Sequence, residues 1–546
     1  MNIEKETSGL QIDLDSIPDQ NTRIIVRHLL NIVETQASEI AKLKIENQKL
    51  RDENNHLKGE QGQPTIRKQS KKSGDVSSEA ERRARNKKKA AKKKNRKKNK
   101  LVIHNTQKCS IEQSQLPSDA VFKGYQSTVA QDIIIRASNT RFDKEVYYSP
   151  SLKKTFIAAL PKGYGGDFGP SIKALILDMH HSEKMTESAI HHFLTNHNID
   201  IARSSISRIL ADRHDDFHQE KKDIMDAGLK SSVHQQIDDT GARVNGINYY
   251  THILCNAFYT AFFTRKNKTR LTILDILMHG NMQFFFNQDA YDLMISMGLS
   301  AKMLDLLKLK NPAAIMNSLE VDELLKTLMP NAKKQQSNRL IILEAGAITA
   351  YQARPDAIKI LLCDDAPQFR QITELLALCW IHDGRHYKKL SPVVPMHRAL
   401  LERFLTQYWD YYHSLLDYQK NPTIQLAKTL TDTFDLLFST QTGYQQLDER
   451  IQKTKDKKEQ LLWVLQYPTL PLHNNASELG ARTQARYRDV SFHTINQKGT
   501  EAKDTFMTIT QTAIKLAVNT YQYILDRVSK KFEMPSLASL IPNPTG

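Results

Sequence analysis

The 546-residue sequence has only four cysteines, and they are widely scattered: Cys109, Cys255, Cys363 and Cys379. No two of them share the short CxxC spacing of a zinc ribbon or a redox motif, and they do not form the dense pattern of a disulfide framework. We therefore expect the cysteines to be reduced and to lie in the core.

Long apolar runs are also missing. No stretch approaches the roughly 18 to 20 uninterrupted apolar residues that a membrane-spanning helix needs, and the first residues lack the charged-then-apolar pattern of a signal peptide. The glycines of residues 161–170 do not form a phosphate-binding loop, because no Gly-Lys-Ser/Thr follows them. The sequence predicts a soluble, intracellular protein with no membrane partner.

Positive charge is concentrated in one segment. Residues 61–100 contain 17 Lys or Arg against three acidic residues, which accounts for +14 of the chain's formal charge of +17. A segment of this density is expected to be disordered alone and to release counterions when it binds a polyanion. We expect a basic linker over residues 59–104 that contacts DNA through side chains such as Arg82, Lys87 and Lys92. The alternative is a solvated linker.

A heptad pattern precedes this linker. Its two core positions are Val26, Val33, Ile40, Asn47, Asn54 and Leu29, Gln36, Leu43, Leu50, Leu57. Asn at a core position favours a parallel, in-register pair, since each buried amide bonds best to its twin. Residues 1–58 are thus predicted to hold a coiled coil that makes a homodimer or a higher oligomer. A single amphipathic helix packed on the body is the alternative.

Two small modules are expected after the linker. Residues 105–170 contain short apolar-alternating runs, at 129–135 and 145–148, which predict a β-rich module. Residues 171–228 predict helices in a helix-turn-helix outline, with Thr186 capping the first and with Arg203 and Arg208 facing outward to contact DNA. A generic helix pair has the same pattern.

Three acidic clusters provide the strongest chemical signal. Asp238-Asp239 and Asp364-Asp365 each end an apolar, β-branched run, and Glu478 follows in a polar stretch of helical character. A hard divalent cation needs oxygen ligands, and two cations flanking a phosphate can activate the attacking oxygen and stabilise the leaving one. The pattern predicts a phosphoryl-transfer enzyme acting on nucleic acid. Surface acids at the ends of elements are the alternative.

The order of elements indicates a fold. Three strand-like runs, a helix over 271–277 and a fourth strand at 358–363 follow the order of a ribonuclease H-like fold. We therefore expect an α+β multidomain protein with a ribonuclease H-like α/β catalytic core over 229–500, helical insertions at 278–355 and 395–465, and a C-terminal helix and tail over 501–546. The aromatic residues of the second insertion could stack on a base, although helix packing is the better explanation of Trp409, Tyr411 and Tyr412.

The sequence around the carboxylates resembles the DDE transposases of bacterial insertion sequences, in a sixty-six-family-like group. The matching stretches are Asp238 to Val244, Asp364 to Phe369, Cys379 to His382 and Leu472 to Arg482. The resemblance implies that Asp238, Asp364 and Glu478 bind two Mg²⁺ or Mn²⁺ ions. It also implies that His382, one helical turn after Cys379, and Arg482 and Arg486, after Glu478, lie at or near bound DNA.

The implied reaction is metal-dependent cleavage of double-stranded DNA at the ends of the element, followed by attack of the freed 3′-hydroxyl on target DNA. A bacterial, nucleoid-associated cytoplasmic protein is then expected. The chain departs from the family in lacking its amino-terminal cysteine-rich zinc motif and in having Leu479 where Arg is common. Two alternatives remain: a catalytically silent, domesticated DNA-binding protein, and a metal-dependent nuclease of the ribonuclease H-like superfamily.

Overall fold

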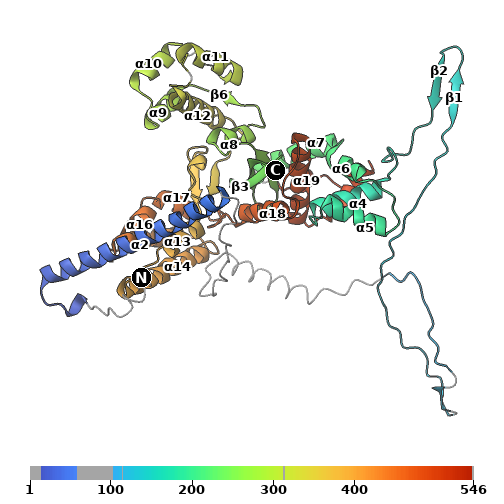
Figure 1. Ribbon diagram of the computed structural model, residues 1–546, viewed down its shortest axis with the longest axis horizontal. Helices are drawn as coiled ribbons and strands as arrows, with labels where there is room; N and C mark the ends of the chain where they lie inside the picture. Colours follow the sequence, from blue (N-terminus) through green and yellow to red (C-terminus); the bar gives the residue numbers. More distant parts are fainter. Residues whose placement is uncertain are drawn as a thin grey trace.

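A computed structural model describes residues 14–57, 102–112, 115–117, 119–310, 314–331 and 333–543. Most of the predicted basic linker, with Arg82, Lys87 and Lys92, lies outside these residues. None of the described helices combines the length and apolar character needed to cross a bilayer. The chain is a mixed α+β protein built on one central sheet, from which two helical units and a hairpin extend (Figure 1).

The central sheet has five strands in the order β5-β4-β3-β8-β9. Within this sheet β3, β4 and β5 pair antiparallel. β8 pairs parallel with β3, and β9 pairs parallel with β8. The helix α8 (Arg270–Leu277) follows the third strand. The predicted mixed fold class is therefore confirmed. The strands are β3 (His234–Val244), β4 (Ile247–Cys255), β5 (Thr260–Arg265), β8 (Ile360–Cys363) and β9 (Leu375–Leu378).

The first acidic strand is longer than expected. Its ladder with β4 continues from Gln236 to Val244, so Asp238 lies in the middle of the strand and not at its end. The prediction that the run ends at Asp238-Asp239 was wrong, because the strand continues through Thr240 and Gly241 to Val244. The true turn is Asn245-Gly246, where both residues adopt positive φ, as a tight hairpin requires.

Two long helices cover one face and one edge of the sheet. α18 (Asn475–Ser491) crosses β3 and β4, and α19 (Gln497–Lys515) runs along the outer strand β5. The expected catalytic boundary at residue 500 thus falls inside a helix that packs on the sheet. Its side chains accept the backbone N–H groups on the free edge of β5, in three bonds: Thr260 to Thr512, Phe262 to Thr508 and Thr264 to Asp504. An edge protected in this way does not pair with other strands.

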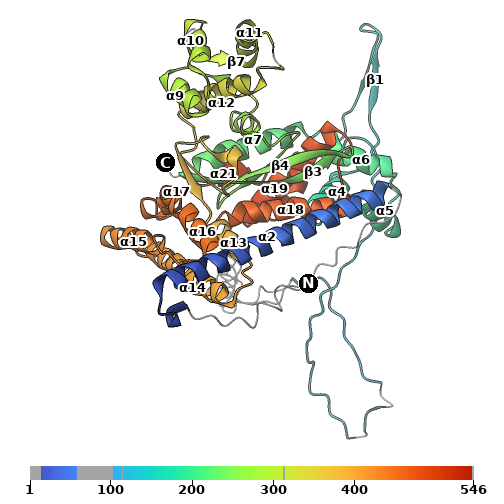
Figure 2. The same ribbon diagram turned by 60° about the vertical axis from the view of Figure 1, so that its left-hand side comes forward.

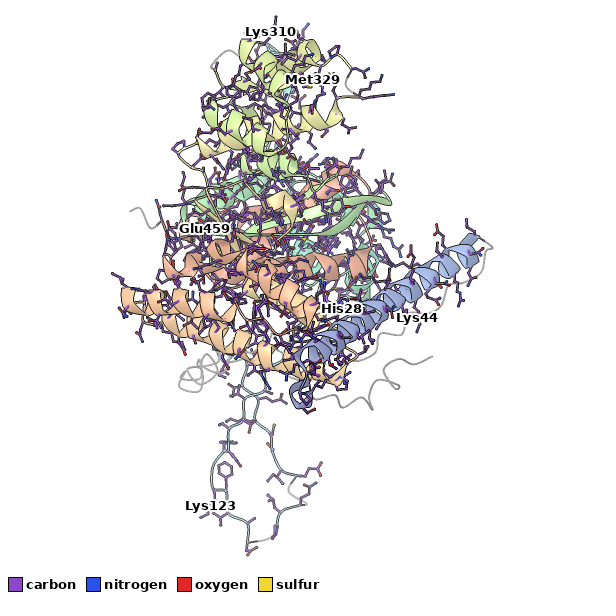
Figure 3. The ribbon with its side chains drawn as sticks, turned by 90° about the vertical axis from the view of Figure 1, so that its left-hand side faces the viewer. His28, Lys44, Lys123, Lys310, Met329 and Glu459 are labelled. Atoms are coloured by element: carbon purple, nitrogen blue, oxygen red, sulfur yellow. The ribbon has the colours of Figure 1, made fainter. Side chains whose placement is uncertain are left out.

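Both predicted insertions are largely helical. The first insertion projects above the sheet, with Lys310 and Met329 at its far end (Figure 3). In the second insertion Trp409, Tyr411 and Tyr412 are buried, as helix packing predicts. The first contains β6 (Gln283–Phe284), α9 (Gln288–Ser296), α10 (Ala301–Lys310), β7 (Met316–Asn317), α11 (Ser318–Leu328) and α12 (Gln336–Gln352). The helix α13 (Trp380–Lys388) precedes the second insertion, which contains α14 (Pro395–Tyr418), α15 (Ile424–Leu437), α16 (Gln445–Lys455), α17 (Lys458–Leu462) and the short turn η4 (Trp463–Leu465).

The helical module packs beside the sheet and against the C-terminal helices. Thr186 caps the helix predicted to follow it, accepting the N–H of Ala189 at 3.1 Å, although this helix is the second of the module because another precedes it. Ile206 and Leu210 face inward, and Arg203 and Arg208 are exposed. Its helices are α4 (Pro170–His181), α5 (Glu187–Asn196), α6 (Arg203–Ala211) and α7 (Asp215–Lys230), and they contact α19, α20 (Thr520–Val528) and α21 (Leu537–Leu540).

In the described residues of the segment predicted as a β-rich module, the strands form only a hairpin. β1 (Val146–Ser149) pairs with β2 (Lys154–Ile157), whereas residues 129–135 belong to no strand. Cys109, in the same part of the chain, is exposed and not in the core, in contrast to the three other cysteines, which are free and buried as expected.

The predicted coiled-coil segment is one helix, α2 (Gln20–Leu57), preceded by the short turn η1 (Leu14–Ser16). Its first half packs on the body through Leu30 and Glu34, which are both buried and do not belong to the heptad core positions. The helix continues past this contact, as the long blue helix of Figure 2 and Lys44 in Figure 3 show. In the second half, Leu43, Leu50 and Leu57 are exposed.

Candidate carboxylate site

Strand pairing fixes the face of the sheet on which Asp238 lies. Asp238 is directly opposite Ile253 on β4, and Ile253 is opposite Phe262 on β5. Opposed residues share one face of a sheet. Ile253 and Phe262 are buried against Met507 of α19 and Ala481 of α18. Asp238 therefore points to the face that α18 covers.

The parallel pairing of β3 and β8 places Asp364 beside Asp238. Gln236 pairs with Leu362, an offset of 126 residues along the chain. The same offset, continued two residues further, brings Asp364 next to Asp238. Asp364 directly follows the last residue of β8, as predicted, and its carboxylate accepts the N–H of Ala366 at 3.2 Å.

Glu478 reaches the same place from the first turn of α18. The start of this helix is tied to β3, because Gln236 accepts the N–H of Ala476 at 3.2 Å. Gly480 allows the helix to approach closely: a Cβ at this position would lie 2.6 Å from Cγ2 of Ile253. The helix α18 therefore packs on Ile253, the residue paired with Asp238. Glu478 lies about half a helical turn before Gly480.

The second aspartate of each pair has other partners. Asp239 faces the opposite side of the sheet, where Gln368 donates a hydrogen bond to it at 2.8 Å and Lys268 lies 3.7 Å away. Asp365 forms ion pairs with Arg370, at 2.8 Å, and with Lys457. Burial raises the pKa of Asp365, yet the hydrogen bonds from these two cations outweigh it and leave the pKa below its ordinary value.

The first aspartate of each pair lies in a site of accumulated negative charge. Burial, with added repulsion from Asp364, Asp239 and Glu478, raises the pKa of Asp238 to about 7. Burial also raises the pKa of Asp364, with Asp239 and Asp365 adding to the effect. Carboxylates whose pKa rises for these reasons are stabilised as anions by a nearby positive charge.

The donor atoms suit a hard divalent cation, but Glu478 is turned toward other partners. Its carboxylate accepts hydrogen bonds from Arg385 at 3.2 Å and from Arg482 at 3.3 Å, and the His382 ring lies 3.5 Å away. Consistent with this orientation, no three His, Cys, Asp or Glu side chains of the described residues are arranged to hold a metal ion. The three carboxylates nevertheless supply the kind of oxygen ligand that Mg²⁺ or Mn²⁺ prefers.

Of the described residues predicted to contact DNA, four arginines lie on α18 and in the helical module, and His382 lies at the carboxylates. Arg482 and Arg486 are exposed on successive turns of α18, leading away from Glu478. Arg486 lies near the helical module: burial lowers the pKa of Lys184, in the α4–α5 loop, and the charge of Arg486 lowers it further. Arg203 and Arg208 belong to α6, in the same module. His382 is half-buried at the carboxylates and accepts a hydrogen bond from Arg385 at 2.9 Å.

Three residues of the site were not predicted. Arg385 contacts both His382 and Glu478, and its position one helical turn after His382 could have indicated this. Asn474, which is fully buried beside His382, lay within a motif that the sequence analysis used only to locate Glu478. Gln236 ties α18 to β3, and a glutamine in an apolar strand gives no signal of such a contact.

Comparison with known proteins finds an uncharacterized relative. No protein-family model matches the chain. The chain is similar to the uncharacterized protein y4jO of Sinorhizobium fredii (strain NBRC 101917 / NGR234), with 29% identity over 308 residues. The matched region covers 56% of this chain and 94% of that protein.

Proposed function

We propose that the chain is a DNA transposase with a ribonuclease H-like core, which cleaves DNA at the ends of a mobile element and joins them to target DNA. The observation that carries the proposal is the position of Asp238, Asp364 and Glu478 on one face of the sheet. The strand order β5-β4-β3-β8-β9, in which β8 and β9 run parallel to β3, supports the same core.

The three carboxylates would hold two Mg²⁺ or Mn²⁺ ions, which supply Lewis-acid activation of the attacking and leaving oxygens of a phosphodiester. Asp238 and Asp364 occupy fixed backbone positions, whereas Glu478 adjusts through its side chain. Arg385 and Arg482, which now bond to Glu478, can offer their guanidinium groups to DNA phosphates when it turns.

The positive charges beyond the site indicate a path for the DNA. Arg482 and Arg486 extend from Glu478 along α18, and Lys184 continues the line into the helical module. Duplex DNA is thus the proposed substrate, with α6 and the basic linker as further contacts. The heptad of α2 would bring two copies, and hence two element ends, together.

The test is a nicking assay on a duplex that carries the DNA flanking the gene, with Mg²⁺ or Mn²⁺. Asp238→Asn, Asp364→Asn and Glu478→Gln retain shape but remove the charge that a hard cation needs. Each should eliminate cleavage while retaining DNA binding in EDTA. Cleavage at the wild-type rate by any one of them would remove that residue from the proposed site.

A further inference from the structure

The segment that joins the basic linker to the helical module exposes far more apolar surface than its surroundings. We call residues 119–160 the arm. Figures 1 and 2 show its hairpin standing away from the body, and Figure 3 places Lys123 in a loop well outside it. Soluble monomers rarely leave large contiguous apolar patches uncovered. The exposed apolar residues of the arm are Val121, Phe122, Tyr125, Val129, Ile133, Ile134, Ile135, Phe142, Val146, Tyr147, Tyr148, Leu152, Phe156 and Ile157.

The hairpin is apolar on both faces. Val146 and Ile157 are paired on one face, and Tyr147 and Phe156 on the other. Their exposed fractions lie between 45% and 65%, so neither face is covered by the rest of the chain. An isolated two-stranded hairpin is marginally stable in water. This one therefore needs partners above and below it or along its edges.

The arm also contains a strand-like run without a partner. Residues 129–135 are rich in β-branched residues, with Val129, Ile133, Ile134 and Ile135, a composition typical of a strand, yet they form no ladder with the described residues. Ile133 is 77% exposed. The outer edges of β1 and β2 carry the unpaired backbone groups that such a run could bond to. The arm thus holds both an unpaired strand-like run and the free edges of a hairpin.

Charge distinguishes a protein partner from a nucleic acid. The arm has six Lys or Arg against four Asp or Glu, whereas the neighbouring residues 61–100 have 17 against three. A nearly neutral, apolar surface gains little from a polyanion, because such binding depends on neutralised phosphates. The same chain carries a second exposed apolar row, Leu43, Leu50 and Leu57 of α2. In a dimer, each of these two surfaces could pack against the same surface of the second copy.

We propose that the arm pairs with the arm of a second copy, with residues 129–135 of each copy adding a strand to the hairpin of the other. The exchange is reciprocal, so that it closes as a two-fold dimer and leaves no apolar arm free to recruit further copies. Each copy would contribute backbone hydrogen bonds and a layer of aliphatic and aromatic side chains to the shared sheet. This assembly does not depend on the chemistry proposed for the carboxylate site.

Hydrogen exchange measured by mass spectrometry on the full chain tests the proposal. Amides of residues 129–135 and 146–157 should exchange slowly at concentrations where the chain is dimeric and rapidly on dilution to monomer. Fast exchange in the dimer would overturn the proposal. Equal protection at every concentration would overturn it too, because the run would then fold on its own hairpin, and so would protection that appears only with duplex DNA.

A substitution separates the arm from the rest of the protein. Ile133→Glu should abolish the protection of the arm in the dimer, while the thermal unfolding of the body stays unchanged because the side chain is exposed in the single chain. Ser138→Glu adds the same charge just outside the run and should leave the protection intact. Loss of protection with both variants, or with neither, would contradict the assignment of residues 129–135 as the exchanged strand.

Discussion

The carboxylate of Glu34 on α2 accepts the backbone N–H of Val394, the residue before the first turn of α14, at 2.7 Å. Its other oxygen accepts the N–H of Val393 at 3.0 Å, and the buried ring of His397 lies 3.2 Å away. An anion is favoured at a helix N-terminus, where the backbone N–H groups lack partners. One buried carboxylate thus caps a helix that is remote in sequence and fixes the direction in which α2 leaves the body.

Glu34→Gln should lower the free energy of unfolding by about 1 to 3 kcal/mol, because it removes a buried, charge-assisted acceptor. Denaturant unfolding measures the loss. Glu39→Gln, at an exposed position of the same helix, should change the stability by less than about 0.5 kcal/mol. An equal effect of the two substitutions would show that the cap contributes nothing.

This contribution should depend on pH. Burial raises the pKa of Glu34, but hydrogen bonds from His397 and the two valine amides outweigh it and hold the pKa below its ordinary value. A depressed carboxyl pKa stabilises the fold above the unfolded value, about 4.3, and the contribution is lost as the pH falls through the folded value. The wild type and Glu34→Gln should therefore differ at pH 7 and converge in acid. A difference that grows in acid would contradict the cap.

Thr508→Val should destabilise the protein by about 1 to 3 kcal/mol, since it leaves the buried N–H of Phe262 on the edge of β5 without an acceptor. Thr510→Val is the matched control: its hydroxyl only donates to the carbonyl of Met507 within α19. Thermal unfolding compares the two. A control as unstable as Thr508→Val would mean that buried threonines of α19 contribute by packing and not by protecting the edge.

Gly480→Ala should cost about 1 to 3 kcal/mol, because the new methyl group overlaps Ile253 and moves α18 away from the sheet. Alanine normally stabilises a helix relative to glycine, so the sign of the effect is diagnostic. Because Glu478 lies on the same turn, the variant should also lose metal-dependent cleavage. Gly499→Ala, whose Cβ would meet only Asn496 at 3.4 Å, should have neither effect.

Arg486→Gln should weaken binding to duplexes of any sequence and reduce the slope of log affinity against log salt by about 1, as expected for one lost phosphate contact. Fluorescence anisotropy at several salt concentrations measures both. Lys428→Gln removes an equal charge from the exposed surface of α15 and should leave the slope unchanged. An unchanged slope for Arg486→Gln would place the DNA elsewhere.

The sequence predicted the structure correctly where the apolar pattern marks a strand or a buried helix face. Apolar, β-branched runs located the strand that contains Asp238 and the strand that Asp364 directly follows, and apolar periodicity predicted the burial of Trp409. Prediction from the sequence failed where contacts between residues far apart in the chain determine the structure. Nothing in the heptad of α2 indicates that Glu34 is buried against α14, and the turn that ends β3 at Val244 depends on Asn245 and Gly246 and not on the residues after Asp239. The run at 129–135 has the composition of a strand but pairs with no strand in the part of the chain that the structure describes.

The central claim is that Asp238, Asp364 and Glu478 form one cation site, whereas the adjacent Asp239 and Asp365 do not belong to it. Mn²⁺ binding to the full-length protein, followed by electron paramagnetic resonance, tests this without knowledge of the DNA sequence. The account predicts that Asp238→Asn, Asp364→Asn and Glu478→Gln each weaken Mn²⁺ binding by more than about 100-fold, beyond the usual effect of an outer residue. Asp239→Asn and Asp365→Asn should bind nearly as the wild type does. Stronger loss from Asp239→Asn than from Asp238→Asn would contradict the account.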